Sequence, residues 1–196
     1  LESIRLSTNL FLVRHAHSVW TRDETRPLSD KGRIGAHKVT EVLRSFPISR
    51  IFSSPSARAQ QSVTPLAKQL GIVIQPEADL RERNLGNWVK GGFEDAVKTT
   101  WDDASFAHPG GESNSSAQER GVAVVNKIVS MYPDETTVLA THGNLLALIL
   151  QHFDPSVGFE FWQTLTMPDI YRLDISTGSS VSVERVWSDE TNIGGT

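Results

Sequence analysis

Residues 9–15 have the sequence NLFLVRH, a short apolar run that ends in an arginine and a histidine. Such a run is typical of a strand that is buried on both faces of a sheet. The segment 29–46 follows with apolar side chains at helical spacing and begins at Ser29, a favourable N-cap residue. Short apolar runs and helical segments continue to alternate along the chain. This alternation predicts an α/β fold: a three-layer sandwich in which helices flank a mainly parallel mixed sheet.

The other expected elements follow from the same patterns. Further strands are expected at 50–53, 72–75, 136–141, 170–175 and 181–187, and further helices at 56–70, 113–132, 144–153 and 155–165. The late pair of strands predicts one antiparallel member of the sheet. The segment 84–111 mixes Gly, Trp, Asp and Pro without clean periodicity. We therefore expect a single domain over residues 1–196, with a lid or insertion at 84–111.

The composition excludes several classes of function. The 196 residues include 19 Lys and Arg against 23 Asp and Glu, which gives a formal net charge of −4. An acidic chain of this kind is a poor candidate for binding nucleic acid or an anionic membrane. Cysteine is absent, which excludes disulfides, thiol catalysis and thiolate metal sites. No apolar run reaches the ~20 residues that span a bilayer, and no secretory signal is evident, so we expect a cytoplasmic protein.

Candidate functional side chains follow the predicted strands. The first strand leads into Arg14, His15, Ala16, His17 and Ser18, and the strand at 136–141 leads into His142 and a helix. Ligands of open α/β sheets bind beyond the carboxyl ends of the strands, and helix N-termini favour anions. Arg58 lies in the first turn of a predicted helix, where the helix dipole disfavours a cation, so its position indicates an anionic partner.

These segments, taken in order, resemble the histidine phosphatase superfamily, also called the phosphoglycerate mutase-like family. The resemblance covers residues 10–144 and rests on four motifs: Leu12-Val13-Arg14-His15, residues 53–61 with Arg58, Leu80-Arg81-Glu82-Arg83 before Gly86 and Trp88, and Thr141-His142-Gly143-Asn144. Two weaker matches are Pro27-Leu28-Ser29 before Gly32, and Pro109-Gly110-Gly111-Glu112-Ser113 followed by Arg120. The resemblance implies a phosphoglycerate mutase-like fold.

The resemblance also implies a metal-independent phosphatase that needs no cofactor and acts on a small phosphorylated metabolite. His15 would be the nucleophile and form a phosphohistidine, with its other ring nitrogen held by a backbone carbonyl. Arg14, Arg58 and a protonated His142 would contact the phosphoryl oxygens. Glu82 would protonate the leaving oxygen and then help to activate water. The expected substrate-binding residues are His17, Ser18, Thr21 and Gly143.

The chain departs from the family pattern in places that bear on its reaction. Ala16 and His17 stand where an acidic pair is usual, and Thr21 stands where asparagine is frequent. The segment 21–27 and the region after Trp88 are shorter than in the mutases. A mutase must shield its intermediate from water while the substrate reorients, so these short segments favour a phosphatase.

Three alternatives stay open. The nearest is a cofactor-dependent phosphoglycerate mutase. A second is a metallohydrolase built on His15 and His17, since residues two apart on a strand point to one face. A third is a non-catalytic module that binds phosphoesters, although such a module has no need for an acid at Glu82. The aromatic side chains expected to shape the lid are Trp88, Phe93, Trp101 and Phe106, together with His108. The sequence favours no particular physiological substrate or oligomeric state.

Overall fold

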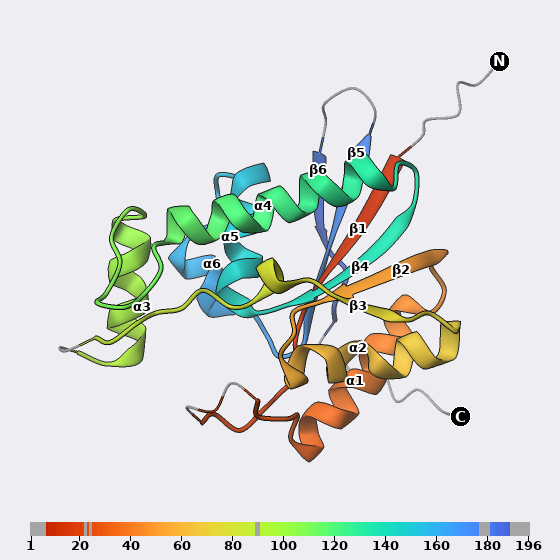
Figure 1. Ribbon diagram of the computed structural model, residues 1–196, viewed down its shortest axis with the longest axis horizontal. Helices are drawn as coiled ribbons and strands as arrows, with labels where there is room; N and C mark the ends of the chain where they lie inside the picture. Colours follow the sequence, from red (N-terminus) through yellow and green to blue (C-terminus); the bar gives the residue numbers. More distant parts are fainter. Residues whose placement is uncertain (1–6, 22, 24, 89–90, 177–180, 189–196) are drawn as a thin grey trace.

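The computed structural model describes residues 7–21, 23, 25–88, 91–176 and 181–188, and a six-stranded sheet lies at its centre (Figure 1). The strands are β1 (Ser7–Arg14), β2 (Ile48–Ser53), β3 (Ile74–Pro76), β4 (Thr136–Thr141), β5 (Asp169–Ser176) and β6 (Val181–Arg185). Their order across the sheet is β3-β2-β4-β1-β5-β6. The first four strands run parallel, and β5 is antiparallel to both of its neighbours. The predicted mainly parallel sheet with one antiparallel strand is confirmed.

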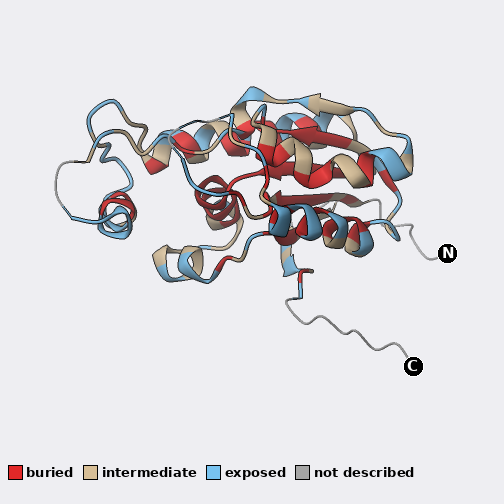
Figure 2. Ribbon diagram, turned by 90° about the horizontal axis from the view of Figure 1, so that it is seen from below, coloured by how far each residue is buried: buried red, intermediate tan, exposed pale blue. Residues whose placement is uncertain are grey.

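Helices cover both faces of this sheet, as the sequence predicts. The helices are α1 (Asp30–Leu43), α2 (Ala57–Leu70), α3 (Phe93–Asp102), α4 (Asn114–Met131), α5 (Gly143–Phe153) and α6 (Phe159–Thr164), and a 3₁₀ turn, η1, spans Ala78–Leu80. Helices α1 and α2 pack together on one face, while α4, α5 and α6 lie on the other (Figure 1). The buried strands between these layers form the core (Figure 2).

Alternating side chains of β1 divide between the two faces of the sheet. Leu10 and Leu12 join the core beneath α4 and α5, while Phe11 and Val13 join the core beneath α1 and α2. All four side chains are fully buried, which explains why residues 10–13 are apolar at every position rather than at every second one. Burial on both faces therefore fixes β1 in the middle of the domain, with Arg14 at its carboxyl end.

Several expected elements have other bounds in the structure; the helix expected at 155–165, for example, is α6 and begins only at Phe159. The segment 84–111, for which the sequence predicted no regular element, contains α3, a ten-residue helix that begins at a Gly92 N-cap. Its apolar positions are few because it stands at one end of the molecule and buries only one side (Figure 1). The third strand begins at Ile74 rather than at residue 72, since Gly71 and Ile72 still complete hydrogen bonds to the end of α2. Among the described residues, no helix is both long and apolar enough to cross a membrane.

Candidate active site

The carboxyl ends of three neighbouring strands bring the predicted site residues to one edge of the sheet. Arg14 pairs with Thr141 across β1 and β4, and Ser53 pairs with Ala140 across β2 and β4. Beyond the strands, the amide of His15 donates to the carbonyl of Thr141 at 3.0 Å. Parallel pairing of β1 and β4 therefore places the loop after Arg14 beside the loop after Thr141, although 127 positions separate them (141 − 14).

His15 is a buried imidazole with one ring nitrogen engaged by the backbone. The residue is 7% exposed, and its Nδ1 is 2.8 Å from the carbonyl oxygen of Ala16. Nδ1 must carry the proton to make this hydrogen bond, which leaves Nε2 with a free lone pair. The sequence predicts that a backbone carbonyl holds this ring nitrogen, and in the structure that carbonyl belongs to Ala16, the next residue.

Burial and neighbouring charges keep His15 neutral. Desolvation is the largest cause and lowers the pKa of His15 well below the usual 6.5, and His142, Arg58 and Arg14 lower it further. The hydrogen bond to Ala16 opposes this shift without cancelling it. A neutral imidazole is the nucleophilic form, so the site holds His15 ready to attack at neutral pH.

His142 lies edge to face against His15, with ring centroids 5.2 Å apart. It is the N-cap residue of α5, and its Nε2 is 2.9 Å from Oγ of Ser54 at the end of β2. Complete burial, followed by the charge of Arg58, lowers the pKa of His142 well below 6.5. In the unliganded protein His142 is therefore neutral, with several arginines near the ring. The protonated His142 expected from the sequence belongs to the complex with a phosphoryl group and stays a prediction.

Arg14 is fixed by two carbonyl groups and by a glycine. Its Nη1 donates to the carbonyl oxygens of Leu165 at 2.8 Å and Thr166 at 3.3 Å. A Cβ added at Gly143 would lie 2.8 Å from Nε and 2.9 Å from Cζ of Arg14, closer than carbon atoms pack. The guanidinium therefore lies directly against the first residue of α5, and a side chain at Gly143 would have to displace it.

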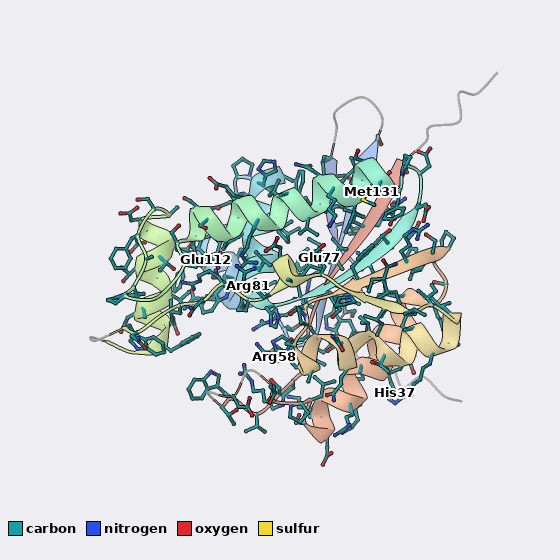
Figure 3. The ribbon with its side chains drawn as sticks, in the orientation of Figure 1. His37, Arg58, Glu77, Arg81, Glu112 and Met131 are labelled. Carbon is teal, nitrogen blue, oxygen red and sulfur yellow. The ribbon has the colours of Figure 1, made fainter. Side chains whose placement is uncertain are left out.

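Arg58 reaches the site from the first turn of α2, where Ser56 is the N-cap. The residue is only 2% exposed, although it is an arginine near a helix N-terminus (Figure 3). Arg58 lines the same cavity as Arg14, His15 and His142, so its guanidinium is placed where it can meet an anion.

Glu82 follows η1 and caps the N-terminus of α5. Its Oε1 accepts from the backbone amides of Arg83 at 2.8 Å and Leu145 at 2.9 Å, and its Oε2 accepts from the amide of Asn144 at 3.0 Å. A carboxyl group offers about four lone-pair sites, so these bonds leave one site, on Oε2, for a proton. The geometry thus fixes both where the carboxyl group points and which oxygen can carry a proton.

A cavity of about 1540 Å³ joins these groups. It is lined by Arg14, His15, Arg58, Glu82, His142 and Gly143, and also by the predicted substrate-binding residues Ser18 and Thr21. Aromatic side chains of Trp20, Trp88, Phe93 and Trp162 line it as well. The cavity is therefore lined both by cationic groups and by aromatic side chains.

His17 is the predicted site residue that the structure directs elsewhere. Its Nδ1 is 2.7 Å from Oγ of Ser29, the N-cap of α1, and its carbonyl accepts from the amide of Ser29. A Cβ at Gly32 would lie 2.0 Å from that same carbonyl oxygen. Among the described residues, those that line the cavity do not include His17. Its contacts with Ser29 instead hold the loop after β1 against the start of α1.

Three further residues belong to this region and were not singled out by the sequence. Ser54 contacts His142, Arg83 lines the cavity, and Asn144 accepts from the indole N–H of Trp101 at 3.0 Å. Their only signal in the sequence is that each lies within or beside a matching motif. Of the predicted lid side chains, Trp88 and Phe93 line the cavity, whereas Trp101 packs behind it.

The described residues offer no group of three His, Asp or Glu side chains that could hold a metal ion. A metallohydrolase would use His15 and His17 as a pair of ligands. Here Nδ1 of His15 contacts the carbonyl of Ala16, whereas Nδ1 of His17 contacts Oγ of Ser29. The arrangement instead places a neutral imidazole, two guanidinium groups and a carboxyl group around one cavity. Such a set can bind a phosphoryl group, attack it and protonate what leaves.

Comparison with known proteins gives a consistent result. A family model described as the histidine phosphatase superfamily (branch 1) matches residues 10–186. Glucosyl-3-phosphoglycerate phosphatase of Mycobacterium tuberculosis is 31% identical over 139 residues, which make up 62% of this chain and 61% of that protein. A probable phosphoglycerate mutase of Yersinia enterocolitica is 26% identical over 155 residues, 72% of each chain. The match thus spans about three fifths of the length of the first relative.

Solved structures share the fold. The native structure of a mycobacterial glucosyl-3-phosphoglycerate phosphatase superposes with a TM-score of 0.73 at 24% identity, covering 90% of this chain and 96% of that one. A phosphoglycerate mutase from Bacillus anthracis gives a TM-score of 0.73 at 17% identity, covering 92% and 93% of the two chains. The predicted phosphoglycerate mutase-like fold is therefore confirmed.

Proposed function

The chain belongs to the histidine phosphatase superfamily, and on that premise we propose that it hydrolyses phosphomonoesters without a metal ion, through a phosphohistidine on His15. The observation that carries the proposal is the state of His15. Its Nδ1 is held by the carbonyl of Ala16, and its surroundings keep the ring neutral, so Nε2 is available to attack phosphorus.

In the first step, Nε2 of His15 forms a bond to phosphorus while the bond from phosphorus to the leaving oxygen breaks. Arg14 and Arg58 supply positive charge to the non-bridging oxygens, which carry the negative charge of the transition state. The proton on Oε2 of Glu82 passes to the leaving oxygen, and the alcohol departs. His142 is neutral in the unliganded site, and the negative charge of the bound phosphoryl group favours its protonated form.

In the second step, a water molecule attacks phosphorus and the bond to Nε2 breaks. The carboxylate of Glu82, now without its proton, accepts the proton that the water loses. Inorganic phosphate leaves, and His15 and Glu82 return to their starting states. Atoms and charges balance over the two steps, with only water consumed.

We propose a small phosphorylated metabolite with a bulky leaving group as the substrate. The cationic groups that line the cavity suit one phosphoryl group, and its aromatic side chains suit the apolar face of a ring. Glucosyl-3-phosphoglycerate, on which the mycobacterial relative acts by its name, is one candidate of this kind. In this proposal the segment 84–111 is the lid of a single domain, and the cytoplasm stays the predicted location.

Hydrolysis is favoured over the mutase alternative because the mouth of the cavity is open to water. The side chains of Trp20 and Phe93, which line it, are 65% and 52% exposed. A phosphohistidine in such a site is accessible to water, whereas a mutase must keep water away. The relatives named as probable phosphoglycerate mutases make direct comparison of the two reactions worthwhile.

The test is a phosphatase assay with p-nitrophenyl phosphate in excess chelator, using the wild type and His15→Ala. We expect the wild type to release phosphate at the same rate with and without chelator, and the variant to lose at least about a thousandfold in kcat. A parallel assay with 3-phosphoglycerate compares phosphate release with isomerisation. Activity that survives in His15→Ala refutes the nucleophile, loss on chelation points to a metal, and faster isomerisation points to a mutase.

A further inference from the structure

The segment from Pro109 to Ser113 lies directly behind the loop that carries Glu82. The amide of Glu112 donates to the carbonyl of Asn84 at 2.8 Å, and the amide of Asn87 donates to the carbonyl of Pro109 at 2.9 Å. A Cβ at Gly111 would lie 2.6 Å from the carbonyl oxygen of Leu85. The two segments therefore run in backbone contact, so the position of one fixes the position of the other.

Arg120 of α4 connects this pair of segments from the other side. Its Nη1 donates to the carbonyl oxygens of Asp79 at 2.6 Å and Arg81 at 2.9 Å, on either side of Leu80. Its Nε and Nη2 donate to the two carboxylate oxygens of Glu112 at 2.7 and 2.9 Å. One guanidinium thus holds both the turn immediately before Glu82 and the segment that contains Glu112.

This contact is well protected from water. The side chains of Arg120 and Glu112 are 10% and 16% exposed, and the pairing with Arg120 helps to lower the pKa of Glu112. A bidentate arginine–carboxylate pair with low exposure is stronger and more rigid than a surface ion pair. The hydroxyl of Thr141 completes the support by donating to the carbonyl of Leu80 at 2.8 Å.

We propose that Arg120 and Glu112 are positioning residues that hold the carboxyl group of Glu82 where it can protonate the leaving oxygen. The inference rests on the proposed function, because it assumes that Glu82 is the acid. Neither side chain lines the cavity in the described part of the chain, so they act through the loop from Asp79 to Asn84 rather than on the substrate. In this proposal the motif at 109–120 positions Glu82 in addition to forming the start of α4.

The dependence on the leaving group separates positioning from general damage. An alkoxide is a poor leaving group and needs the proton of Glu82, whereas dinitrophenolate leaves without one. We therefore compare kcat/KM, which reports the steps up to transfer onto His15, for glycerol phosphate and 2,4-dinitrophenyl phosphate. The variants are Arg120→Lys, which keeps the charge but loses the bidentate geometry, and Glu112→Gln.

We expect each variant to lower kcat/KM for glycerol phosphate on the order of 10- to 100-fold, part of the effect of a general acid, and to change it for dinitrophenyl phosphate by less than about threefold. In a Glu82→Gln background, Arg120→Lys should cause no further loss with glycerol phosphate, because the group it positions is gone. The matched control is Arg50→Lys, which alters a similar pair with Glu135 (2.8 Å) at the opposite end of the sheet and should change neither substrate.

An equal loss with both substrates overturns the inference, since it indicates damage to the whole site. Unchanged hydrolysis of glycerol phosphate in both variants overturns it too, as does a further loss in the Glu82→Gln background. These outcomes are distinct from a failure of the proposed function, which shows itself in the wild type. If the wild type hydrolyses neither ester, or if His15→Ala still hydrolyses dinitrophenyl phosphate, the phosphatase assignment fails and the positioning role falls with it.

Discussion

His15 and Glu82 are each held by backbone groups, so their chemistry depends on the chain around them more than on other side chains. The carbonyl of Ala16 selects the tautomer of His15, and three amides orient the carboxyl group of Glu82. Backbone partners do not rotate away as side chains do, so both groups are placed before substrate arrives. Such preorganisation costs nothing at the moment of reaction.

Gly143 gives a prediction at this scale. In Gly143→Ala the added Cβ would lie 2.8 Å from Nε of Arg14, so the guanidinium must move out of its bonds to Leu165 and Thr166. We expect kcat/KM for p-nitrophenyl phosphate to fall on the order of 10- to 100-fold, as for a displaced phosphate-binding arginine. The measurement is steady-state kinetics, with circular dichroism as a check on folding.

The control for this substitution is Gly158→Ala, at the N-cap of α6. A Cβ there meets only Oε2 of Glu160, at 3.8 Å, which is an ordinary contact. We expect wild-type kinetics from Gly158→Ala. Wild-type kinetics from Gly143→Ala would show that Arg14 does not need its place against the first residue of α5.

The residues that the sequence predicted for the site and those that it missed differ in a physical way. Arg14 ends β1, and His15 and His142 directly follow β1 and β4. The carboxyl ends of parallel strands share one edge of the sheet, so the local pattern was enough to predict that these residues lie together. The contact between Ser54 and His142 depends on β4 lying between β1 and β2, which no short segment specifies. The direction of His17 likewise depends on the entry angle of α1.

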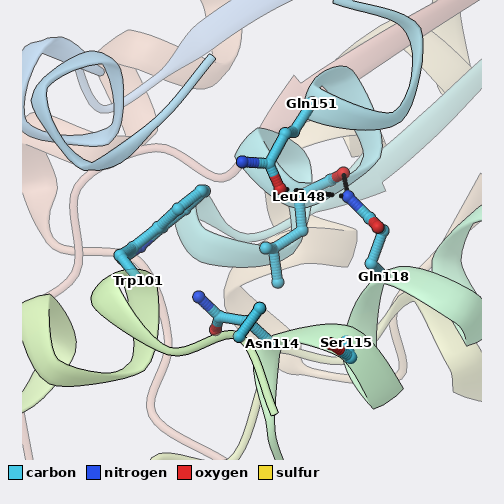
Figure 4. A pocket seen from close by; sticks show the side chains of 7 residues that line it. Trp101, Asn114, Ser115, Gln118, Leu148 and Gln151 are labelled. Carbon is cyan, nitrogen blue, oxygen red and sulfur yellow. Dashed lines mark hydrogen bonds between the residues drawn. The ribbon is translucent and has the colours of Figure 1, made fainter. Parts of the chain in front are cut away.

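At the scale of elements, α3 is attached to the sheet domain by a few specific contacts. Trp101 donates to the side chain of Asn144, and Thr100, fully buried, accepts from Arg83 at 3.2 Å. A cavity of about 40 Å³ lies beside Trp101, lined also by Asn114, Gln118 and Leu148 (Figure 4). The helix thus touches the residue after Glu82 and a residue in the first turn of α5, so its position is linked to the site.

Trp101→Phe tests this attachment. The ring remains but the indole N–H is lost, which leaves the buried oxygen of Asn144 without its donor at a cost of about 1–2 kcal/mol. We expect the amides of α3 to exchange with deuterium about 5- to 30-fold faster, while those of β1 and β4 keep their rates. Hydrogen-exchange mass spectrometry measures both sets at once.

A matched control is Trp162→Phe, which changes an aromatic ring packed near Phe93 and Phe159. The indole nitrogen of Trp162 makes no hydrogen bond to the described residues, so exchange of the α3 amides should change less than in Trp101→Phe. Equal acceleration in the two variants would mean that ring packing, not the bond to Asn144, holds α3.

The helices that the sequence predicted well are those that carry their own boundary signals. Ser29 caps α1 as expected, Ser56 caps α2, and Gly71 ends α2 in a left-handed conformation with φ of 68°. Helix α3 carries weaker signals, since Gly92 has no capping side chain, although Asp95 accepts from its amide at 3.1 Å, and only Ala96, Val97 and Thr100 are buried. Its helical form depends on contacts with the rest of the chain, which local periodicity does not contain.

At the scale of the whole molecule, an acidic chain encloses a cationic cavity. The net charge is −4, yet Arg14, Arg58 and two histidines meet at one point. The two imidazoles stay neutral because burial and the arginines oppose further positive charge. In the proposed function, a phosphoryl group supplies the negative charge that balances these cations.

This arrangement predicts how stability depends on pH. Both histidines have a lower pKa in the folded chain than the usual 6.5, so below pH 6.5 the unfolded chain binds more protons and the free energy of unfolding falls. Each histidine contributes a slope of up to about 1.4 kcal/mol per pH unit, from pH 6.5 down to its lowered pKa, and above pH 6.5 this dependence ends. Urea unfolding in phosphate-free buffer at pH 7.5, 6.5 and 5.5 measures it.

The comparison that isolates these two groups is the double variant His15→Asn, His142→Asn. Removing both imidazoles should lower the slope between pH 6.5 and 5.5 by up to about 2.7 kcal/mol per pH unit, whatever the carboxylates contribute. An unchanged slope in the double variant would show that the histidines bind protons equally in the folded and unfolded chains.

In the proposed reaction the phosphoryl group passes through Nε2 of His15. Trapping this phosphohistidine is the sharpest test of the proposal. The enzyme is mixed with 2,4-dinitrophenyl phosphate, quenched within milliseconds in alkali, which preserves phosphohistidine, and digested for mass spectrometry. Because Nδ1 is held by the carbonyl of Ala16, we expect phosphate on Nε2 of His15 in the wild type and no phosphohistidine in His15→Ala. Phosphate on His17 or His142, or full turnover with no labelled histidine, would contradict it.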